Sequence, residues 1–120
     1  MTTNPPPPID LEGFRAAMRD SGIEEIVVPM LQLFGQEAPK GMAAIESTMA
    51  AGDLEAASRA AHSFKSSAGN VRAKALAELL QELENAAKDN DAAKSARLLP
   101  SVRTAHEDVL RYLAESGIVA

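Results

Sequence analysis

The sequence contains no cysteine and no tryptophan, and only 3% of its 120 residues are aromatic. Without cysteine the chain has no disulfide framework, no thiolate zinc site and no cysteine nucleophile. Its 12 Lys and Arg residues are outnumbered by 17 Asp and Glu residues, which gives a formal net charge of −5. This balance argues against nucleic acid as a partner, because there is no basic excess to neutralise phosphates.

Long hydrophobic runs are missing as well. The most apolar stretch, residues 26–34, includes Pro29 and Gln32 and is far shorter than the roughly 20 residues of a membrane helix. The first residues, MTTNPPPP, have neither the basic nor the apolar region of a signal peptide. We therefore expect a cytoplasmic protein that does not bind a membrane.

Alanine is the most frequent residue type in the sequence. The chain has 23 Ala but only 15 Val, Ile and Thr residues in total, which favours helices over strands. The four prolines Pro5–Pro8 predict an extended polyproline segment. We expect residues 1–8 to be a disordered Pro-rich tail, rather than a ligand for an SH3-like groove, and residues 9–117 to form one helical domain.

Apolar residues recur at spacings of three and four, as in amphipathic helices. These stripes span residues 11–18, 27–49, 54–68, 76–87 and 98–113. Turn signals separate them at Ser21-Gly22, Gly52-Asp53, Gly69-Asn70 and Asp89-Asn90-Asp91, and Ser116-Gly117 follows the last one.

Two prolines fall inside these stripes. Pro39 predicts either a kink or a break in the second helix, and Pro100 predicts a distortion of the last one. Asp10 is the expected N-cap of the first, short helix. Because the turns between the long helices are short, we expect an all-α fold, an antiparallel up-down four-helix bundle with a short additional N-terminal helix.

One histidine stands on the outer face of the third predicted helix. His62 lies about 130° from the centre of the apolar stripe, with Ser58 at i−4, Lys65 at i+3, Ser66 at i+4 and Gly69 a turn further. An exposed imidazole is largely neutral at pH 7 and is then a good nucleophile. The Lys65 ammonium disfavours the imidazolium and can compensate a phosphoryl group on the ring, to which the Ser66 hydroxyl can donate.

The stretch Ala61–Ala73, AHSFKSSAGNVRA, resembles the signature of histidine-containing phosphotransfer (HPt) domains. That signature reads roughly His-x-x-Lys-Gly-Ser-[Ser/Ala]-x-x-[Leu/Ile/Val]-Gly-Ala. The following segment Leu76–Glu84 and the preceding turn Ala51–Leu54 are also similar to the family. The resemblance extends over about residues 9–116. It implies a helical bundle whose histidine accepts a phosphoryl group from an aspartyl phosphate on a receiver domain and passes it onward.

Carried onto this sequence, the resemblance makes His62 the phospho-accepting residue and Lys65 the charge partner of the phosphoryl group. Ser66 and Arg72 stand where the family usually has Gly. Ser66 adds either bulk where a partner loop approaches or a hydrogen bond, and Arg72 affects partner choice more than chemistry. The residues expected in the phosphoryl environment or on the docking surface are Ser58, Ser66, Gly69 and Arg72. Catalysis would come mainly from positioning and charge compensation. We expect no cofactor or metal in this chain, with Mg²⁺ bound in the acidic pocket of the receiver domain.

The implied partners are receiver domains of a hybrid sensor histidine kinase and of a response regulator, and the chain is expected to be a monomer. It has no Gly-rich phosphate loop and no Walker pattern, so it would be a phosphotransfer intermediate rather than an autonomous kinase. Two alternatives stay open. One is a helical docking module that binds a receiver without being phosphorylated, and the other is a helical domain that resembles the family by chance.

The remaining polar residues have structural interpretations. His106 lies about 30° from the centre of the last apolar stripe, which predicts a partly buried, hydrogen-bonded histidine rather than a metal ligand. Ser67 points away from His62 and is expected to bond within its own helix or to a neighbour. Four acidic residues in or just after the fourth apolar stripe are interpreted as a solvated helix face: Glu78, Glu82, Glu84 and Asp89.

Overall fold

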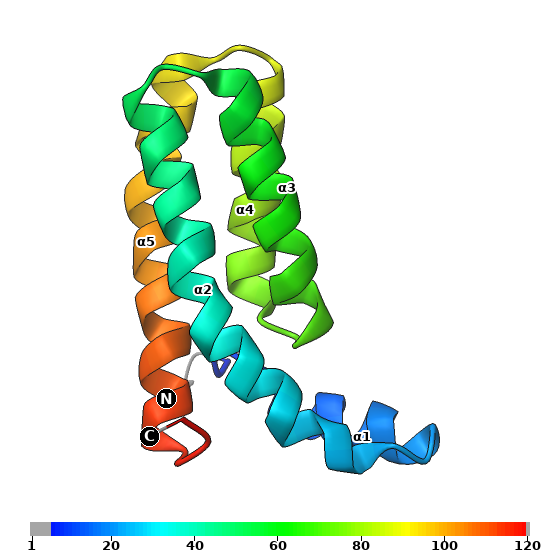
Figure 1. Cartoon of the computed structure of the whole chain (residues 1–120). Helices are drawn as coiled ribbons and strands as arrows, with labels where there is room; N and C mark the ends of the chain where they lie inside the picture. Colours follow the sequence, from blue (N-terminus) through cyan, green and yellow to red (C-terminus); the bar gives the residue numbers. More distant parts are fainter. Residues whose placement is uncertain (1–5, 120) are drawn as a thin grey trace, which may run out of the picture.

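The computed structural model describes residues 6–119, and these residues form helices and turns without strands (Figure 1). The elements are α1 (Leu11–Asp20), the single 3-10 turn η1 (Glu24–Ile26), α2 (Val27–Ala50), α3 (Leu54–Asn70), α4 (Lys74–Lys88) and α5 (Ala92–Glu115). The prediction of an all-α fold is confirmed. Most of the expected disordered tail, residues 1–5, lies outside the described residues, and Pro6–Pro8 precede α1 without helical structure.

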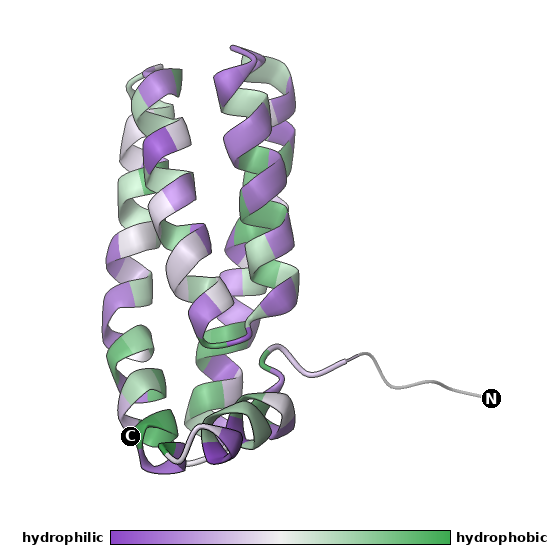
Figure 2. Cartoon of the chain, turned by 90° about the vertical axis from the view of Figure 1, so that its right-hand side faces the viewer, coloured by the Kyte–Doolittle hydropathy of each residue, from purple (hydrophilic) through white to green (hydrophobic). Residues whose placement is uncertain are grey.

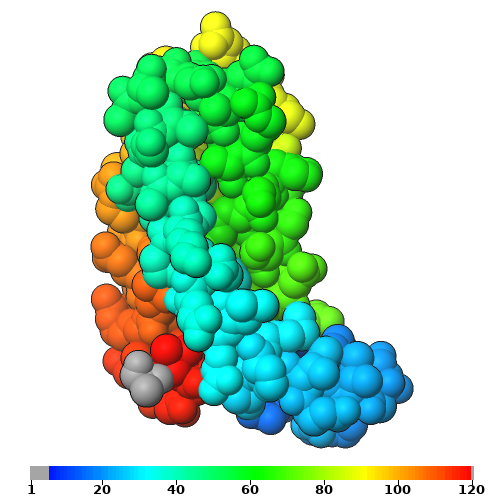
Figure 3. Space-filling model, viewed as in Figure 1, coloured from blue at the N-terminus to red at the C-terminus, as the bar shows by residue number. Residues whose placement is uncertain are grey.

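The four long helices, α2 to α5, lie side by side, and the chain runs alternately up and down through them (Figure 1). The short helix α1, η1 and the beginning of α2 extend to one side at the lower end. Figure 3 shows these residues as a blue and cyan projection beyond the body of the molecule. The helices of the bundle are therefore accompanied by an N-terminal arm, which we define as residues 11–35.

Local capping decides where three of the helices begin. The carboxylates of Asp10, Asp53 and Asp91 each accept a hydrogen bond, 3.0 Å long, from a backbone N–H three residues onward. Such an N-cap stabilises a helix by about 1 kcal/mol, because it satisfies one of the donors that the first turn leaves free. The predicted N-cap at Asp10 is confirmed.

The five α-helices end in the same way, with one residue in the left-handed region. The backbone N–H of the next residue then bonds to the carbonyl five residues earlier, over 2.8–3.2 Å. The left-handed residues are Gly22, Gly52, Arg72, Asn90 and Gly117. Glycine adopts this conformation without penalty and Asn tolerates it, but the Cβ of Arg72, at φ 61°, is strained there.

Neither internal proline interrupts its helix. Helix α2 continues through Pro39, and its lower part is inclined away from the bundle axis in Figure 1, so the helix is bent rather than broken. A proline lacks the N–H that would bond to the carbonyl four residues earlier, which makes it a common site of bending. Helix α5 likewise continues through Pro100. Gly69 and Asn70 form the last turn of α3 rather than stopping it earlier.

The core lies between the apolar faces of the helices, each of which carries green and purple residues in Figure 2. The ring of Phe64 on α3 lies 6.2 Å from that of Phe34 on α2. A Cβ at Gly41 would stand 3.0 Å from Phe64, so glycine allows α2 and α3 to pack closely there. None of the helices within residues 6–119 is long and apolar enough to cross a membrane.

His106 packs into this core, with its ring 5.9 Å from Phe64 in an edge-on contact. Its predicted burial is confirmed, since the residue is only 8% exposed. The predicted hydrogen bonding is wrong for one ring nitrogen, because His106 Nε2 is buried and has no partner among the described residues. Burial lowers the pKa of His106, although Glu107 and Glu46 oppose this effect. Burial of the ring therefore favours the neutral imidazole.

Candidate functional site

His62 stands on α3, and its ring contacts α4. Its side chain is 61% exposed, which agrees with the outward position predicted from the helix geometry. The ring is nevertheless anchored on one side: Nδ1 lies 3.2 Å from both carboxylate oxygens of Glu84, on α4. The Nδ1 edge of the imidazole is thus held by the protein, while most of the side chain is exposed to solvent.

Glu84 is the centre of a charged network between α3 and α4. Its side chain is only 4% exposed, yet it receives two ammonium groups in addition to the imidazole. Lys65 Nζ lies 2.9 Å from Oε1, and Lys88 Nζ lies 3.0 Å from Oε2. Lys65 also donates to Gln81 Oε1 at 2.8 Å. A buried carboxylate needs such partners, because an uncompensated charge at this depth would be strongly destabilising.

These contacts determine the charge of Glu84. Burial by itself would raise the pKa of the carboxyl, but hydrogen bonds from Lys65, Lys88 and His62 outweigh burial and lower the pKa to about 2. Glu84 is therefore ionised at neutral pH. The result is a carboxylate that can accept hydrogen bonds but has no proton to donate.

The ionised state of Glu84 fixes the tautomer of the neutral His62 ring. A carboxylate facing Nδ1 can only accept, so Nδ1 must carry the proton. The lone pair then resides on Nε2, the nitrogen on the far side of the ring from Glu84. An imidazole held in this way presents one nucleophilic nitrogen in a defined direction.

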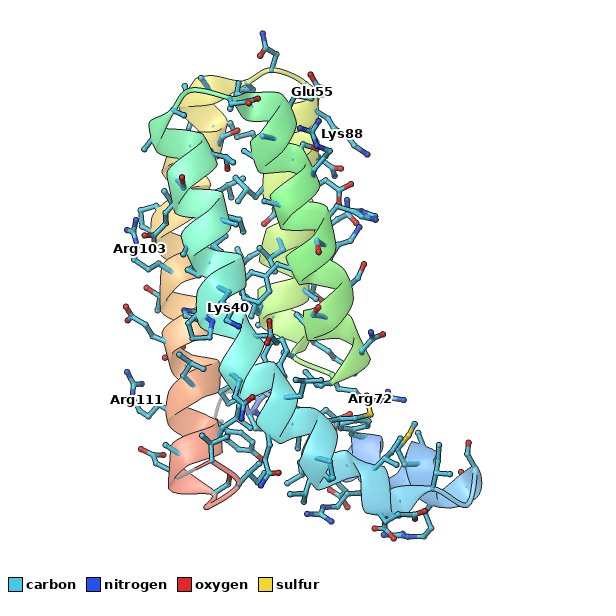
Figure 4. All side chains as sticks on the ribbon, viewed as in Figure 1. Lys40, Glu55, Arg72, Lys88, Arg103 and Arg111 are labelled. Atoms are coloured by element: carbon cyan, nitrogen blue, oxygen red, sulfur yellow. The ribbon has the colours of Figure 1, made fainter. Side chains whose placement is uncertain are left out.

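Four further residues were expected in the phosphoryl environment or on the docking surface, and they lie in different surroundings. Ser66 is exposed, but its hydroxyl donates to the His62 carbonyl at 3.2 Å. Gly69 is exposed, with nothing within 4 Å of where a Cβ would be. Ser58 differs from the expectation, because it is buried and donates to the Glu84 carbonyl at 3.5 Å. Arg72 is half-buried in the turn after α3, which Figure 4 shows at the opposite end of the α3–α4 pair from Lys88.

The sequence model of the Hpt domain matches residues 29–112 of this chain. The chain belongs to the Hpt domain family. Family membership supports a histidine phosphotransfer role in a phosphorelay. The fold is similar to the crystal structure of histidine-containing phosphotransfer protein B (HptB) from Pseudomonas aeruginosa PAO1, with a TM-score of 0.82 and 22% identity over 93% of this chain and 96% of that chain. No curated protein matches the chain.

One residue beside His62 was misread from the sequence. The interpretation of Glu84 as part of a solvated face is wrong, whereas Glu78, Glu82 and Asp89 are exposed as expected. The surroundings of His62 accordingly contain a carboxylate and a second ammonium, not only Lys65 and small residues. A signal was available, because Glu84 follows Leu80 by four residues and so borders the apolar stripe of α4. Ser67 donates to the Ser63 carbonyl at 3.4 Å, as expected for a bond within its helix.

An apolar groove lies between the arm of this Hpt domain and the end of α3. Leu33, on α2, is the most exposed large hydrophobic side chain of the described residues, at 58%. It borders a cavity of about 160 Å³. The cavity is lined by Met30, Leu33, Phe34, Glu37, Ser67, Asn70 and Val71. Apolar surface therefore adjoins the helix that carries His62.

Proposed function

We propose that this Hpt domain is a phosphorelay carrier, built as an antiparallel up-down four-helix bundle with an additional N-terminal helix. In this proposal His62 accepts a phosphoryl group from an aspartyl phosphate on one receiver domain and passes it to another receiver domain. Lys65 is the charge partner of the phosphoryl group. Ser66, Gly69 and Arg72 belong to the surface that meets the partner.

The observation that carries the proposal is the contact between His62 Nδ1 and the buried Glu84 carboxylate. It leaves the Nε2 lone pair exposed and available for in-line attack. In the transfer step the Nε2 lone pair forms a bond to phosphorus, and the bond from phosphorus to the aspartyl oxygen breaks. The electron pair of that bond returns to the aspartate as a carboxylate.

No proton moves during this step. The ring becomes an imidazolium that carries the phosphoryl group on Nε2 and keeps its proton on Nδ1. Glu84, as an anion in contact with Nδ1, stabilises the positive charge that develops on the ring. The reverse reaction then has a good leaving group, so the same contact serves both acceptance and donation.

The surface around His62 supports docking of a compact partner. Ser66 and Gly69 are exposed and leave room for a receiver loop to approach the ring. Leu33 offers an apolar contact beside Ser67 and Asn70, in the last part of α3. Such a partner would bring the Mg²⁺ in its own acidic pocket, and no cofactor is assigned to this chain. We propose receiver domains of a hybrid sensor histidine kinase and of a response regulator as partners, and a monomeric, cytoplasmic carrier.

A second function, docking without phosphorylation, is favoured by Arg72. The residue occupies a strained backbone position where the family signature has Gly, and strained positions are often retained for binding. In that case His62 would be part of a contact surface rather than a nucleophile. The two functions make opposite predictions for His62→Gln.

The test uses a receiver domain phosphorylated with acetyl phosphate and mixed with the wild-type chain or with His62→Gln. Intact mass is recorded under alkaline conditions, which preserve phosphohistidine. The carrier proposal expects one added phosphoryl group on the wild type and none on His62→Gln. It also expects both proteins to bind the receiver in an NMR titration.

Circular dichroism of both proteins verifies that the fold is retained. If several receivers bind but transfer no phosphoryl group to the wild type, the docking function is correct and the carrier proposal is wrong. Phosphorylation of His62→Gln to the same extent would assign the acceptor to another residue.

A further inference from the structure

Two ammonium groups share one buried carboxylate beside the nucleophile. Lys65 and Lys88 approach different oxygens of Glu84, at 2.9 and 3.0 Å. Before phosphorylation these three groups carry a combined charge of +1, to which a His62 ring in its neutral, nucleophilic form adds nothing. A single ammonium would suffice to neutralise Glu84, so the second must be explained.

The two lysines differ in what they can reach. Lys65 follows His62 by three residues on the same helix, so its ammonium can move from Glu84 to a phosphoryl group on the ring. Its side chain is 23% exposed, and the move brings the ammonium toward solvent. Lys88 follows Glu84 by four residues on α4 and is 64% exposed, so it can remain on the carboxylate.

Phosphorylation changes the charge of the site. The phosphoryl group brings a charge of about −2, and the ring becomes positive. With both lysines the site then has a total charge near zero, and without Lys88 it has about −1. Moving Lys65 to the phosphoryl group in the absence of Lys88 would also leave the Glu84 carboxylate buried without an ammonium partner, which is costly.

We propose that Lys88 is a positioning residue for phosphotransfer, because it keeps Glu84 paired when Lys65 turns to the phosphoryl group on His62. This inference rests on the proposed function. Lys88 acts through Glu84 and touches neither the phosphoryl group nor the receiver domain. Its contribution therefore depends on the negative charge of Glu84.

The test is a double-mutant cycle of Lys88→Gln and Glu84→Gln, measured as the rate of His62 phosphorylation at low ionic strength. Lys88→Gln alone is expected to slow the reaction about tenfold, comparable to the loss of one charge-assisted hydrogen bond. In the Glu84→Gln background, the same substitution is expected to change the rate less than about twofold, because the carboxylate is no longer charged. Lys88→Arg should restore most of the rate.

Lys94→Gln is the matched control, since Lys94 is an exposed lysine on α5 and its loss changes the net charge equally. It should leave the rate unchanged. Each protein is also phosphorylated with phosphoramidate, which transfers its phosphoryl group to Nε2 with loss of ammonia and needs no receiver. The same tenfold effect of Lys88→Gln is expected with this donor.

Several results would overturn the inference. An equal effect of Lys88→Gln with and without the Glu84 charge would mean that Lys88 acts on the phosphoryl group directly. An effect seen only with the receiver would make Lys88 a docking residue. A wild-type rate in Lys88→Gln would mean that Lys88 has no role. Failure of the wild type to react with both donors would overturn the proposed function and this inference with it.

Discussion

The imidazole of His62 and the carboxylate of Glu84 form a contact in which one ring nitrogen lies 3.2 Å from two oxygens at once. The histidine is mostly exposed and the glutamate is almost completely buried. A surface imidazole is thus oriented by an interior charge, which water cannot easily screen. This arrangement gives the ring a fixed tautomer without removing it from the reach of a partner.

Glu84→Gln is expected to slow phosphorylation of His62 about 10- to 100-fold, the effect of losing one or two charge-assisted hydrogen bonds. The amide can also donate to Nδ1, so the ring should populate the tautomer with its proton on Nε2. Imidazole ¹⁵N chemical shifts measure the tautomer, and the transfer assay measures the rate. Glu82→Gln, an exposed neighbour with the same charge change, should match the wild type. An unchanged tautomer in Glu84→Gln would contradict this account.

The stability of the protein should fall in acid because of Glu84. Its pKa is about 2 in the folded state, below the ordinary value of 4.5. As the pH falls, Glu84 of the unfolded chain therefore binds a proton before Glu84 of the folded protein does. The contribution of Glu84 to the free energy of unfolding, about 3 kcal/mol, is lost as the pH falls from about 4.5 to 2. Urea unfolding between pH 7 and pH 2.5 measures this loss, which should be smaller in Glu84→Gln. Parallel pH profiles of the two proteins would show that the carboxylate is not stabilised by folding.

Arg72→Gly should stabilise the fold by about 1 kcal/mol, because glycine removes the strain of a side chain at φ 61°. Part of the gain is offset by the greater freedom of glycine in the unfolded chain. Asn90→Gly is the matched substitution, at φ 57°, and should gain less, since Asn tolerates the left-handed region. Urea denaturation measures both. Equal changes at the two positions would mean that Arg72 is held there without strain.

His106 should make the protein less stable as the pH falls from 7 to 5. Burial lowers the pKa of its ring in the folded state, so the unfolded chain binds a proton that the folded protein resists. The loss begins near pH 6.5 and has a slope of up to about 1.4 kcal/mol per pH unit. His106→Leu should remove most of this slope, as measured by thermal or urea unfolding at each pH. A slope that persists in the variant would assign the effect to other groups.

Much of the fold follows from local sequence. The N-caps Asp10 and Asp53 and the turn residues Gly22 and Gly52 act within a few residues of themselves, so their positions predicted where helices begin and end. The outward direction of His62 followed from the spacing of apolar residues on one helix. At Pro39 the sequence left two alternatives open, a kink or a break, because packing decides whether a helix tolerates a proline.

The partners of His62 could not be predicted in the same way. Glu84 is 22 residues away in the chain, and its contact depends on how α3 and α4 are rotated against each other. A glutamate next to an apolar stripe is usually solvated, and here it is buried because Lys65 and Lys88 arrive from two helices. The missing hydrogen bond of His106 Nε2 is likewise a property of the assembled core.

The side chains of the charged network around His62 all lie on α3 and α4, which form one continuous hairpin from Leu54 to Lys88. The exposed Leu33 belongs to the N-terminal arm, an earlier part of the chain. In the proposed function, the reacting groups and this apolar contact of the partner surface therefore lie in separate stretches of sequence. Under that proposal, substitutions in the arm would change the choice of partner and leave the groups around His62 unchanged, so specificity would diverge after gene duplication while the reaction is retained.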